Sequence, residues 1–504
     1  MKDRINHTGG ATAPCVAVLG TGSEVGKSIV ATALCRVFSN RGMRVAPFKA
    51  QNMSNNSGVT PEGLEMGRAQ IVQAEAARIP PHVDMNPILL KPTSDVGAQV
   101  VLLGTAIGNS SAGQYHDKKQ ALLSEACGAL DRLRQAHELI VMEGAGSCAE
   151  VNLMAHDIVN FKMAEHAGAP AVLVADIHRG GVFAQIVGTL ECLPRDKKDR
   201  IAGVLINRFR GDLQLFSDGV EWIERKTGKK VFGVLPWVDN IGIESEDSVV
   251  IENPGRISDR QIERPAVAVI RLPHISNFTD FDPLLALPDL HLYFLEKVQD
   301  LTAFEAVILP GSKNTRFDLQ WLHDSGWTGE IRRLADRGRH VLGICGGYQM
   351  LGSRVNDPQG LEGPAGFTAG LDLLPVETTL KAPKTTTRTR FAWNGVEAEG
   401  YEIHMGQTVL RQGQSLFRVL AQNNRACSRH DGCRLEKGNV LGTYIHGLFD
   451  NPAITRKWLK TIGLHGVRPA SLHGPAARDR EYDRLAEHFI RHVDVEAIAS
   501  VVSS

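Results

Sequence analysis

The sequence lacks long apolar runs, an excess of charge of either sign, and a rich supply of cysteine. No apolar run approaches the roughly 18 residues that a bilayer-spanning helix needs, and the first residues lack the apolar core of a secretory signal. Lys+Arg and Asp+Glu are equal at 56 each, which leaves no basic footprint for nucleic acid or an anionic membrane. Eight cysteines in 504 residues are too few for a disulfide framework. We therefore expect a cytoplasmic protein with neither a nucleic-acid partner nor a membrane partner.

Short apolar runs separated by helix-length segments make up the first half of the chain. They are continuous and rich in β-branched residues, which indicates strands buried on both faces of a mostly parallel α/β sheet. In such sheets, ligands bind beyond the carboxyl ends of the strands. The runs are CVAVLG (15–20), RVAPFK (44–49), LIVMEG (139–144), AVLVAD (171–176), GVLINRF (203–209) and VFGVLPW (231–237).

A second series of apolar runs follows a polar, turn-rich segment, ENPGRISDRQIERP (252–265), which has the composition of a linker. We therefore predict an α/β protein with two doubly wound domains, 14–251 and 266–453. A flexible N-terminus (1–13) and a helical C-terminal segment (454–504) are expected to flank them. The runs of the second series are AVAVIRLP (266–273), AVILPGS (306–312), HVLGICGG (340–347) and NVLGTYIHG (439–447).

The stretch GTGSEVGKS, residues 20–28, has the form of a phosphate-binding loop. It follows a buried strand and precedes a helix-like segment, so backbone N–H groups and a helix N-terminus would hold phosphates. Lys27 would neutralise the β- and γ-phosphates of a nucleotide, and Ser28 would ligate Mg²⁺. Thr21 stands where the usual pattern has its first glycine, so the loop, with Gly22 and Gly26, is a variant.

Polar side chains close several predicted strands of the first domain, where ligands of a parallel sheet belong. Glu143 closes LIVMEG and is the candidate acid for Mg²⁺, while Asp176, which closes AVLVAD, has a weaker claim to the same role. Asn207 is positioned to read a nucleotide base. The simpler alternatives are solubilising acids at strand ends for Glu143 and Asp176, and a helix cap for Asn207.

The stretch GICGG in the second domain fits the pattern G-x-nucleophile-x-G, in which a strand, a sharp turn with the nucleophile and a helix follow in order. Cys345 is then the nucleophile, and the Gly346 N–H can donate to an oxyanion. Gly311, in the turn PGSKNT, is the candidate second donor, and His446, at the end of the last strand, is the candidate base. The alternative is a small buried cysteine and a structural histidine.

These motifs coincide in a known family. GICGGYQML, PGSKNT and TYIHG resemble class I glutamine amidotransferases, in which a cysteine attacks the glutamine side-chain amide and releases ammonia through a thioester. Those domains usually carry a glutamate two residues after the histidine, where this sequence has Leu448. The remaining Cys–His dyad resembles the branch found in the corrinoid-amidating synthases.

The N-terminal half resembles the dethiobiotin-synthetase-like ATPases through GTGSEVGKS and MEGAGS (142–147). The pairing of the two halves is similar to that of cobyrinic acid a,c-diamide synthases and cobyric acid synthases, and the finer match, over about 14–455, is to the latter family. One departure is Ala50, where proline is expected. The finer motifs are FKAQNMSNNS (48–57), HVDMNPILLKPTSD (82–95), EGAGSCAEVNL (143–153), DIHRGGVFAQIVGT (176–189) and GYEIHMG (400–406).

The resemblance implies ATP- and glutamine-dependent amidation of the b, d, e and g carboxylates of adenosylcobyrinic acid a,c-diamide, giving adenosylcobyric acid. ATP and Mg²⁺ are the expected co-substrate and metal, and no permanently bound cofactor is expected. Lys49, Gln51 and Asn52 are candidates for holding the substrate carboxylate or phosphate. Glu402 either replaces the missing acid beside His446 or faces the corrinoid.

Two alternatives stay open at this point. A cobyrinic acid a,c-diamide synthase would amidate the a and c carboxylates and then stop. A non-catalytic P-loop ATPase switch would use a degenerate glutaminase domain for docking, against which the intact Cys345 and His446 argue.

Overall fold

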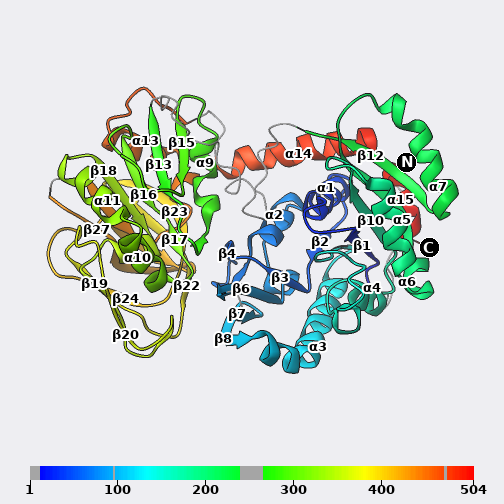
Figure 1. Cartoon of the computed structure of the whole chain (residues 1–504), viewed down its shortest axis with the longest axis horizontal. Helices are drawn as coiled ribbons and strands as arrows, with labels where there is room; N and C mark the ends of the chain where they lie inside the picture. The colour runs from blue at the N-terminus through cyan, green and yellow to red at the C-terminus, as the bar shows by residue number, and fades with distance from the viewer. Residues whose placement is uncertain (1–11, 95–96, 239–264, 437, 470–473, 504) are drawn as a thin grey trace.

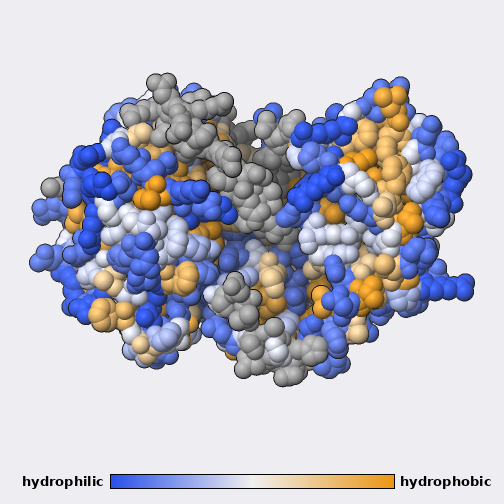
Figure 2. Space-filling view, viewed as in Figure 1, coloured by the Kyte–Doolittle hydropathy of each residue, from blue (hydrophilic) through white to orange (hydrophobic). Residues whose placement is uncertain are grey.

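The structure, a computed structural model, describes residues 12–94, 97–238, 265–436, 438–469 and 474–503. Its two lobes are each built around a parallel sheet, with the N-terminal lobe on the right of Figure 1. Hydrophilic side chains cover most of the face shown in Figure 2, which is hollowed where the lobes meet. The predicted N-terminus (1–13) and linker (252–265) lie almost entirely outside the described residues. No helix in the described ranges is both long enough and apolar enough to cross a bilayer.

The sheet of the N-terminal lobe has six parallel strands, and all the apolar runs predicted for the first domain form its strands. Several of these strands are buried along their whole length, which confirms that the continuous apolar runs mark a sheet covered on both faces. In spatial order the strands are β12 (Lys230–Pro236), β11 (Ile201–Phe209), β10 (Ala171–Asp176), β1 (Cys15–Gly20), β9 (Leu139–Glu143) and β2 (Val45–Phe48).

Helices cover this sheet on both sides, because the crossover connections between parallel strands must pass over its faces. Phosphate-loop residues lead directly from β1 into α1, so the loop lies at the carboxyl end of a central strand. The helices of the lobe are α1 (Lys27–Asn40), α2 (Arg68–Ala76), α3 (Ala112–Ala136), α4 (Phe161–Ala167), α5 (Val182–Cys192), α6 (Arg195–Arg200) and α7 (Ser217–Thr227).

The C-terminal segment is helical, as predicted, but it divides between the two lobes. Its first helix, α13 (Pro452–Thr461), packs into the core of the second lobe, whereas α14 (Pro475–His492) and α15 (Val495–Ser503) pack into the core of the first. Figure 1 shows α14 (red) running back to α1. The buried Arg36 of α1 pairs with Asp479 at 2.6 Å and with Asp483 at 2.8 Å, which ties the end of the chain to the helix that follows the phosphate loop.

The second lobe contains a six-stranded sheet that is parallel except at one edge. All four predicted runs form strands in it. In spatial order the strands are β15 (His291–Leu295), β13 (Ala266–Ile270), β16 (Ala306–Leu309), β18 (His340–Ile344), β28 (Val440–Thr443) and the antiparallel β27 (Cys433–Arg434). Its helices are α9 (Asp282–Leu285), α10 (Thr315–Asp324), α11 (Trp327–Asp336) and α12 (Gly346–Met350), with short turns η4 (Phe278–Phe281) and η5 (Leu448–Asp450).

Smaller sheets bring the lobes together. In the N-terminal lobe these are β3 (Gln51–Met53), β6 (Ile88–Ser94), β7 (Gly97–Leu102) and β8 (Thr105–Ser111), and the hairpin β4 (Ser57–Val59) and β5 (Glu65–Gly67). The second lobe has β20 (Gly366–Ala369), β19 (Arg354–Asp357), β21 (Val376–Thr379) and β24 (Gln407–Leu410) in one sheet. It has β23 (Val396–His404), β22 (Thr385–Trp393), β25 (Phe417–Gln422) and β26 (Arg425–Asp431) in another, and the pair β14 (Ile275–Ser276) and β17 (Gly311–Ser312).

The lobes meet where the hairpin β4–β5 packs against β22 and β23. The Asn277 side chain of the second lobe donates to the Ser57 carbonyl at 2.9 Å, and the Phe278 N–H donates to the Asn56 side chain at 3.1 Å. Lys384 forms a buried ion pair with Glu65 at 2.7 Å. These contacts place the hairpin β4–β5 of the N-terminal lobe against β22, β23 and the start of η4 in the second lobe.

Candidate functional site

The phosphate loop has the strand–loop–helix context that the sequence predicts. It connects β1 to α1, and Lys27 is the first residue of the helix. The Lys27 ammonium donates to the carbonyls of Gly22 at 2.8 Å and Gly146 at 2.9 Å. Gly146 follows β9, so the lysine joins two loops at the carboxyl edge of the sheet. The Thr21 hydroxyl, which replaces the usual glycine, lies at the exposed side, 3.5 Å from Gln185.

Glu143 lies at the centre of a buried polar cluster beside the loop. One of its carboxylate oxygens accepts hydrogen bonds from the Ser28 hydroxyl and the Lys49 ammonium, both at 2.9 Å. The other accepts from the Gln73 amide at 2.5 Å. Three separate motifs predicted Ser28, Glu143 and Lys49 as site residues. The fold brings these residues together because β1, β9 and β2 are neighbours in the sheet.

The cluster opens into a cavity of about 650 Å³ that includes Gln51 and Asn52 among its lining residues. A hydroxyl and a carboxylate within hydrogen-bonding distance of each other are hard oxygen donors of the kind Mg²⁺ takes alongside phosphate oxygens. The donor set of Ser28 and Glu143 therefore fits Mg²⁺.

Asp176 and Asn207 are neighbours on adjacent strands, as their positions at strand ends predict. The Asp176 carboxylate accepts from the His178 N–H at 2.7 Å and pairs with Arg208 at 2.9 Å. The Asn207 side chain donates to the Val25 carbonyl at 2.9 Å, so it supports the phosphate loop from behind. Neither residue lines the 650 Å³ cavity, whereas Arg208 does. Their roles in binding a metal or a base stay predictions.

Cys345 occupies the sharp turn that the G-x-nucleophile-x-G pattern predicts. β18 ends at Ile344, and α12 begins at Gly346. The backbone of Cys345 has φ 52° and ψ −109°, a conformation rarely adopted by residues other than glycine. A Cβ atom on Gly347 would lie 2.0 Å from the Leu309 carbonyl oxygen, so only glycine allows this close approach of helix and strand. The turn therefore presents the thiol at the end of a central strand.

The two predicted oxyanion donors lie close together. Gly346 is the first residue of α12, so its N–H has no intrahelical acceptor. Ser312 follows Gly311 in the chain, and a Cβ atom on Gly346 would lie 2.8 Å from the Ser312 nitrogen. A Cβ atom on Gly311 would in turn lie 3.3 Å from the His446 ring. Thiol, donors and imidazole thus surround one small space.

His446 is oriented by an acid that the sequence analysis did not find. The Asp280 carboxylate is 2.6 Å from His446 Nδ1 and also accepts from the Gly447 N–H at 2.9 Å. The Tyr401 ring stacks on the imidazole at 5.3 Å between centroids. Burial lowers the pKa of His446, but the Asp280 charge, the thiolate of Cys345 and hydrogen bonds to both raise it to about 10 overall. This arrangement favours the protonated imidazolium form of His446.

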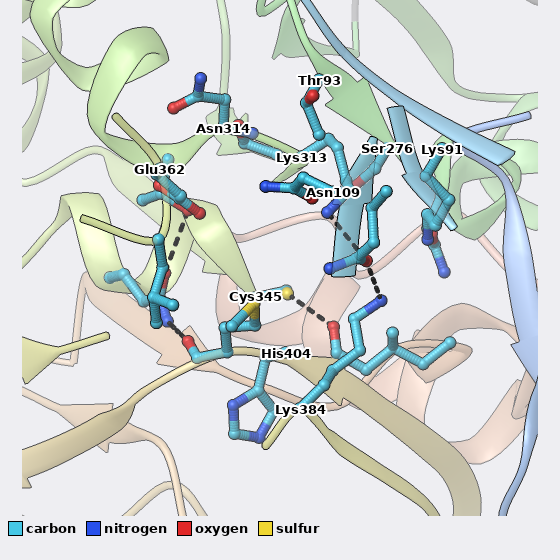
Figure 3. A pocket seen from close by; sticks show the side chains of 18 of the residues that line it. Lys91, Thr93, Asn109, Ser276, Lys313, Asn314, Cys345, Glu362, Lys384 and His404 are labelled. Carbon is cyan, nitrogen blue, oxygen red and sulfur yellow. Dashed lines mark hydrogen bonds between the residues drawn. The ribbon is translucent and has the colours of Figure 1, made fainter. Parts of the chain in front are cut away.

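A cavity of about 270 Å³ adjoins the thiol and is lined by both lobes. Figure 3 shows Lys91 and Asn109 of the N-terminal lobe facing Lys313, Lys384 and Cys345 of the second. The Cys345 thiol is 3.4 Å from the Ile403 carbonyl. The glutaminase-like site therefore opens onto the contact between the lobes.

Comparison with known proteins covers nearly the whole chain. Residues 16–249 match the family model of the CobQ/CobB/MinD/ParA nucleotide binding domain, and residues 266–454 match the CobB/CobQ-like glutamine amidotransferase domain. A cobyric acid synthase of Chlorobium phaeobacteroides is 50% identical over 97% of this chain and 99% of the relative. One of Chlorobaculum tepidum is 50% identical over 96% and 97%. One of Salmonella agona is 46% identical over 97% and 98%.

The chain belongs to the cobyric acid synthase family. The resemblance drawn from the motifs is thereby confirmed, and so is a two-domain α/β architecture with a P-loop nucleotide-binding domain and a class I glutaminase domain. A glutamine-hydrolysing ligase is the kind of enzyme that this family name describes, and the family does not favour the P-loop switch.

In this cobyric acid synthase family member, the missing acid after the histidine is replaced from another part of the chain. Leu448 is 2% exposed and packs in the apolar core, so it has no polar contact to offer His446. Asp280 lies 166 residues before His446 in sequence, and η4 carries it to the histidine. The only feature of the sequence that could have pointed to Asp280 is its place in the acidic segment NFTDFDP (277–283). That segment has no fixed spacing to the histidine motif, so the sequence does not link the two.

Glu402 does not replace that acid, so this half of the sequence prediction is wrong. Its carboxylate accepts from Thr389 at 2.7 Å and Gln422 at 3.0 Å, and it lies 3.4 Å from His404. Burial alone would raise the pKa of Glu402, but the hydrogen bond and charge of His404, with Thr389, lower it to about 2. β23 turns this side chain toward β22 and β25, whereas Asp280 occupies the position beside His446.

Proposed function

We propose that this chain uses ATP and glutamine to amidate the b, d, e and g carboxylates of adenosylcobyrinic acid a,c-diamide, giving adenosylcobyric acid. The observation that carries the proposal is the presence, in one chain, of a Cys345–His446–Asp280 site and a phosphate loop with Lys27. Relatives named cobyric acid synthase match both domains over nearly their full length.

At the glutaminase site, the Cys345 thiolate attacks the side-chain amide carbon of glutamine. N–H groups of Gly346 and the Gly311 turn donate to the oxyanion that forms. His446 then protonates the departing nitrogen, so ammonia leaves and a γ-glutamyl thioester remains on Cys345. Asp280 keeps the imidazole oriented with Nδ1 toward the carboxylate. Water hydrolyses the thioester, with His446 as the base, and glutamate is released.

At the synthetase site, a substrate carboxylate accepts the γ-phosphoryl group of ATP, because oxide is too poor a leaving group for ammonia to displace directly. Lys27 and the loop N–H groups stabilise charge on the transferred phosphoryl. Ser28 and Glu143 would hold Mg²⁺, which when bound would further neutralise the charge of the phosphates. Lys49, Gln51 and Asn52 lie in the same cavity, where they can hold the carboxylate. Ammonia then displaces phosphate and forms the amide.

The deciding experiment counts amides. The purified protein is incubated with ATP, Mg²⁺, glutamine and either the a,c-diamide or, in a separate reaction, cobyrinic acid, and the corrinoid is analysed by mass spectrometry. We expect new amides at the four remaining carboxylates. A protein that converts cobyrinic acid to the a,c-diamide and then stops would support the diamide-synthase alternative. ATP hydrolysis with no new amide on either corrinoid would support the switch alternative.

Three parts of this proposal follow from composition and family. We propose that the enzyme acts in the cytoplasm, that ATP and Mg²⁺ are used without a permanently bound cofactor, and that the corrinoid is a substrate released after amidation.

A further inference from the structure

The cavity of about 270 Å³ beside Cys345 contains charged side chains that the attack of the thiol does not use. Figure 3 shows two of them, Lys313 and Glu362, together with Cys345 around this space. Pockets that hold ligands measure about 300 to 1,000 Å³, so a cavity near the lower end of this range suits a small molecule. The charges on its walls then indicate which groups that molecule carries.

Lys313, which follows β17, is a cavity lysine without an anionic partner among the described residues. Its ammonium donates to the Gln99 side chain at 3.1 Å. The other two lysines of the cavity, Lys91 and Lys384, each pair with Glu65 at 2.7 Å. Burial, followed by the charges of these two lysines, lowers the pKa of Lys313 to about 7. A bound anion would stabilise the charged form of Lys313, so this part of the cavity favours a carboxylate.

Glu362, in the segment between β19 and β20, lines the same cavity. Its carboxylate accepts from the Arg316 N–H at 3.0 Å, and no charged side chain of the described residues pairs with it. Burial raises the pKa of Glu362 to about 7, against the Arg316 N–H and the charge of Lys313. A bound cation would stabilise the carboxylate, so this part of the cavity favours an ammonium group.

A small molecule that carries a carboxylate and an ammonium group on the same carbon is an α-amino acid. The position of Lys313 fits the backbone end of an amino acid whose side chain reacts at Cys345. Lys313 follows Ser312 in the turn that begins at Gly311, the predicted oxyanion donor. The Ser312 nitrogen would lie 2.8 Å from a Cβ atom on Gly346, the other donor. A glutamine amide held at these donors would extend its α-carbon past them, into the cavity.

We propose that Lys313 binds the α-carboxylate, and Glu362 the α-ammonium group, of the glutamine that reacts at Cys345. The inference rests on the proposed function, in which glutamine is the nitrogen donor. It goes further by assigning the residues that distinguish an α-amino acid from other amides. An amide without these charges would form neither charge-assisted hydrogen bond and would bind weakly.

Gln99 on β7 brings the N-terminal lobe into this recognition. Its side-chain oxygen accepts from Lys313 at 3.1 Å and from Lys384 at 3.2 Å, and the residue is 6% exposed. Both lysines belong to the second lobe, so an amide of the first lobe orients them. Gln99 is therefore a positioning residue that acts on glutamine through Lys313.

The test pairs each charged side chain with a nitrogen donor that lacks its partner group. Glutaramate is glutamine without the α-ammonium group, and 4-aminobutanamide is glutamine without the α-carboxylate. Ammonia release from glutamine and from both analogues is measured as kcat/KM, with the full-length protein, ATP, Mg²⁺ and the a,c-diamide present. A side chain that binds one group should matter only for the donors that carry that group.

For Glu362→Gln we expect kcat/KM for glutamine to fall about thirtyfold, mainly through KM, because a charged hydrogen bond to the substrate is lost. Glutaramate has no ammonium group and should react within about twofold of its kcat/KM with the parent. An equal loss with glutamine and glutaramate would make Glu362 a structural residue and overturn the assignment. Unchanged values with glutamine would overturn it as well.

For Lys313→Met we expect the complementary pattern. Glutamine and glutaramate both carry the carboxylate, so kcat/KM for each should fall about thirtyfold. The analogue 4-aminobutanamide lacks the carboxylate and should stay within about twofold of the parent value. Equal losses for all three donors, or no loss for glutamine, would overturn the role of Lys313.

Gln99→Met removes the acceptor of Lys313 and keeps a side chain of similar length. We expect KM for glutamine and glutaramate to rise about threefold, with kcat within about twofold of the parent. Both constants for 4-aminobutanamide should stay at the parent values. A change of the same size for 4-aminobutanamide would exclude this positioning role.

Exposed residues of the second lobe supply the controls. Glu397→Gln and Lys460→Met make the same chemical changes at side chains that do not line the cavity, and they should keep the parent values for all three donors. Failure of the proposed function is distinguishable, because the parent protein would then release no ammonia from glutamine. A parent that uses glutamine, with variants that treat the three donors alike, would overturn this inference alone.

Discussion

The two active sites of this molecule are held ready in different ways. At the thiol site the backbone sets the geometry: Cys345 is fixed in a strained turn, and His446 is held between Asp280 and the Tyr401 ring. At the nucleotide site charged side chains hold one another, with Lys27 on two carbonyls and Glu143 shared among several donors. The backbone and packed side chains fix the geometry of the first site, whereas the second site consists of side-chain contacts that a bound ligand could replace.

The difference follows from the chemistry of each site. Covalent attack needs one sulfur atom within bonding distance of one carbon, so the frame around it must be fixed before glutamine binds. In the proposed mechanism phosphoryl transfer is assisted mainly by charge, so Lys27 and Glu143, which pair with protein groups in this structure, would turn to phosphate and Mg²⁺. Substitutions should therefore separate the two sites cleanly.

The largest effect is expected from Cys345→Ala. Without the thiol, no thioester forms, and glutamine-dependent amidation should fall by about four orders of magnitude while ammonium-dependent amidation continues. Both are measured as corrinoid amide formed per minute. Cys433→Ala, another buried cysteine of the same lobe, is the control. If glutamine-dependent turnover persisted in Cys345→Ala, the assignment of the nucleophile would be wrong.

Lys27→Ala should affect both nitrogen sources. Loss of the cation at the transferred phosphoryl should lower amidation from glutamine and from ammonium alike, by about a thousandfold. The exposed Lys162 supplies the control, Lys162→Ala. A variant that lost only the glutamine-dependent rate would contradict the division of labour between the lobes.

Asp280→Asn should weaken the glutaminase without abolishing it, by about a hundredfold in kcat/KM for glutamine. Asp280 is the main group that raises the pKa of His446 to about 10 against burial, so its removal should lower that pKa. His446 would then lose its proton at lower pH, and the alkaline limb of the pH profile should move toward neutrality. Asp289→Asn, at an exposed acid in the same lobe, should leave the profile in place. An unshifted profile in Asp280→Asn would remove Asp280 from this role.

The smallest effect on chemistry is expected where the C-terminal segment meets α1. Arg36 is buried, but its partners Asp479 and Asp483 on α14 are 54% and 41% exposed, so Arg36→Met should lower the free energy of unfolding of the N-terminal lobe by about 1 kcal/mol. Thermal unfolding monitored with and without ATP measures this change. Glutamate release by the second lobe should stay at the parent rate. If Arg36→Met lost glutaminase activity at the same temperature at which its N-terminal lobe unfolds, the two lobes would unfold together.

Features that depend on local sequence were predictable. The continuous apolar runs gave the strands of both sheets, and the spacing around Cys345 and Lys27 gave their turns, because each needs only adjacent residues. Asp280 was not predictable, since its contact with His446 joins segments with no fixed spacing between them. The return of α14 to α1 was missed for the same reason: an amphipathic helix reveals that it has a buried face, not which domain covers it.

The most direct test of the central claim follows the nitrogen. The parent protein is given the a,c-diamide, ATP, Mg²⁺ and glutamine that carries a heavy nitrogen isotope in its side-chain amide, and the corrinoid is weighed by mass spectrometry. We expect a product with four new amides, all carrying the heavy isotope. A corrinoid that remained the diamide, or that gained amides without the isotope, would contradict this claim.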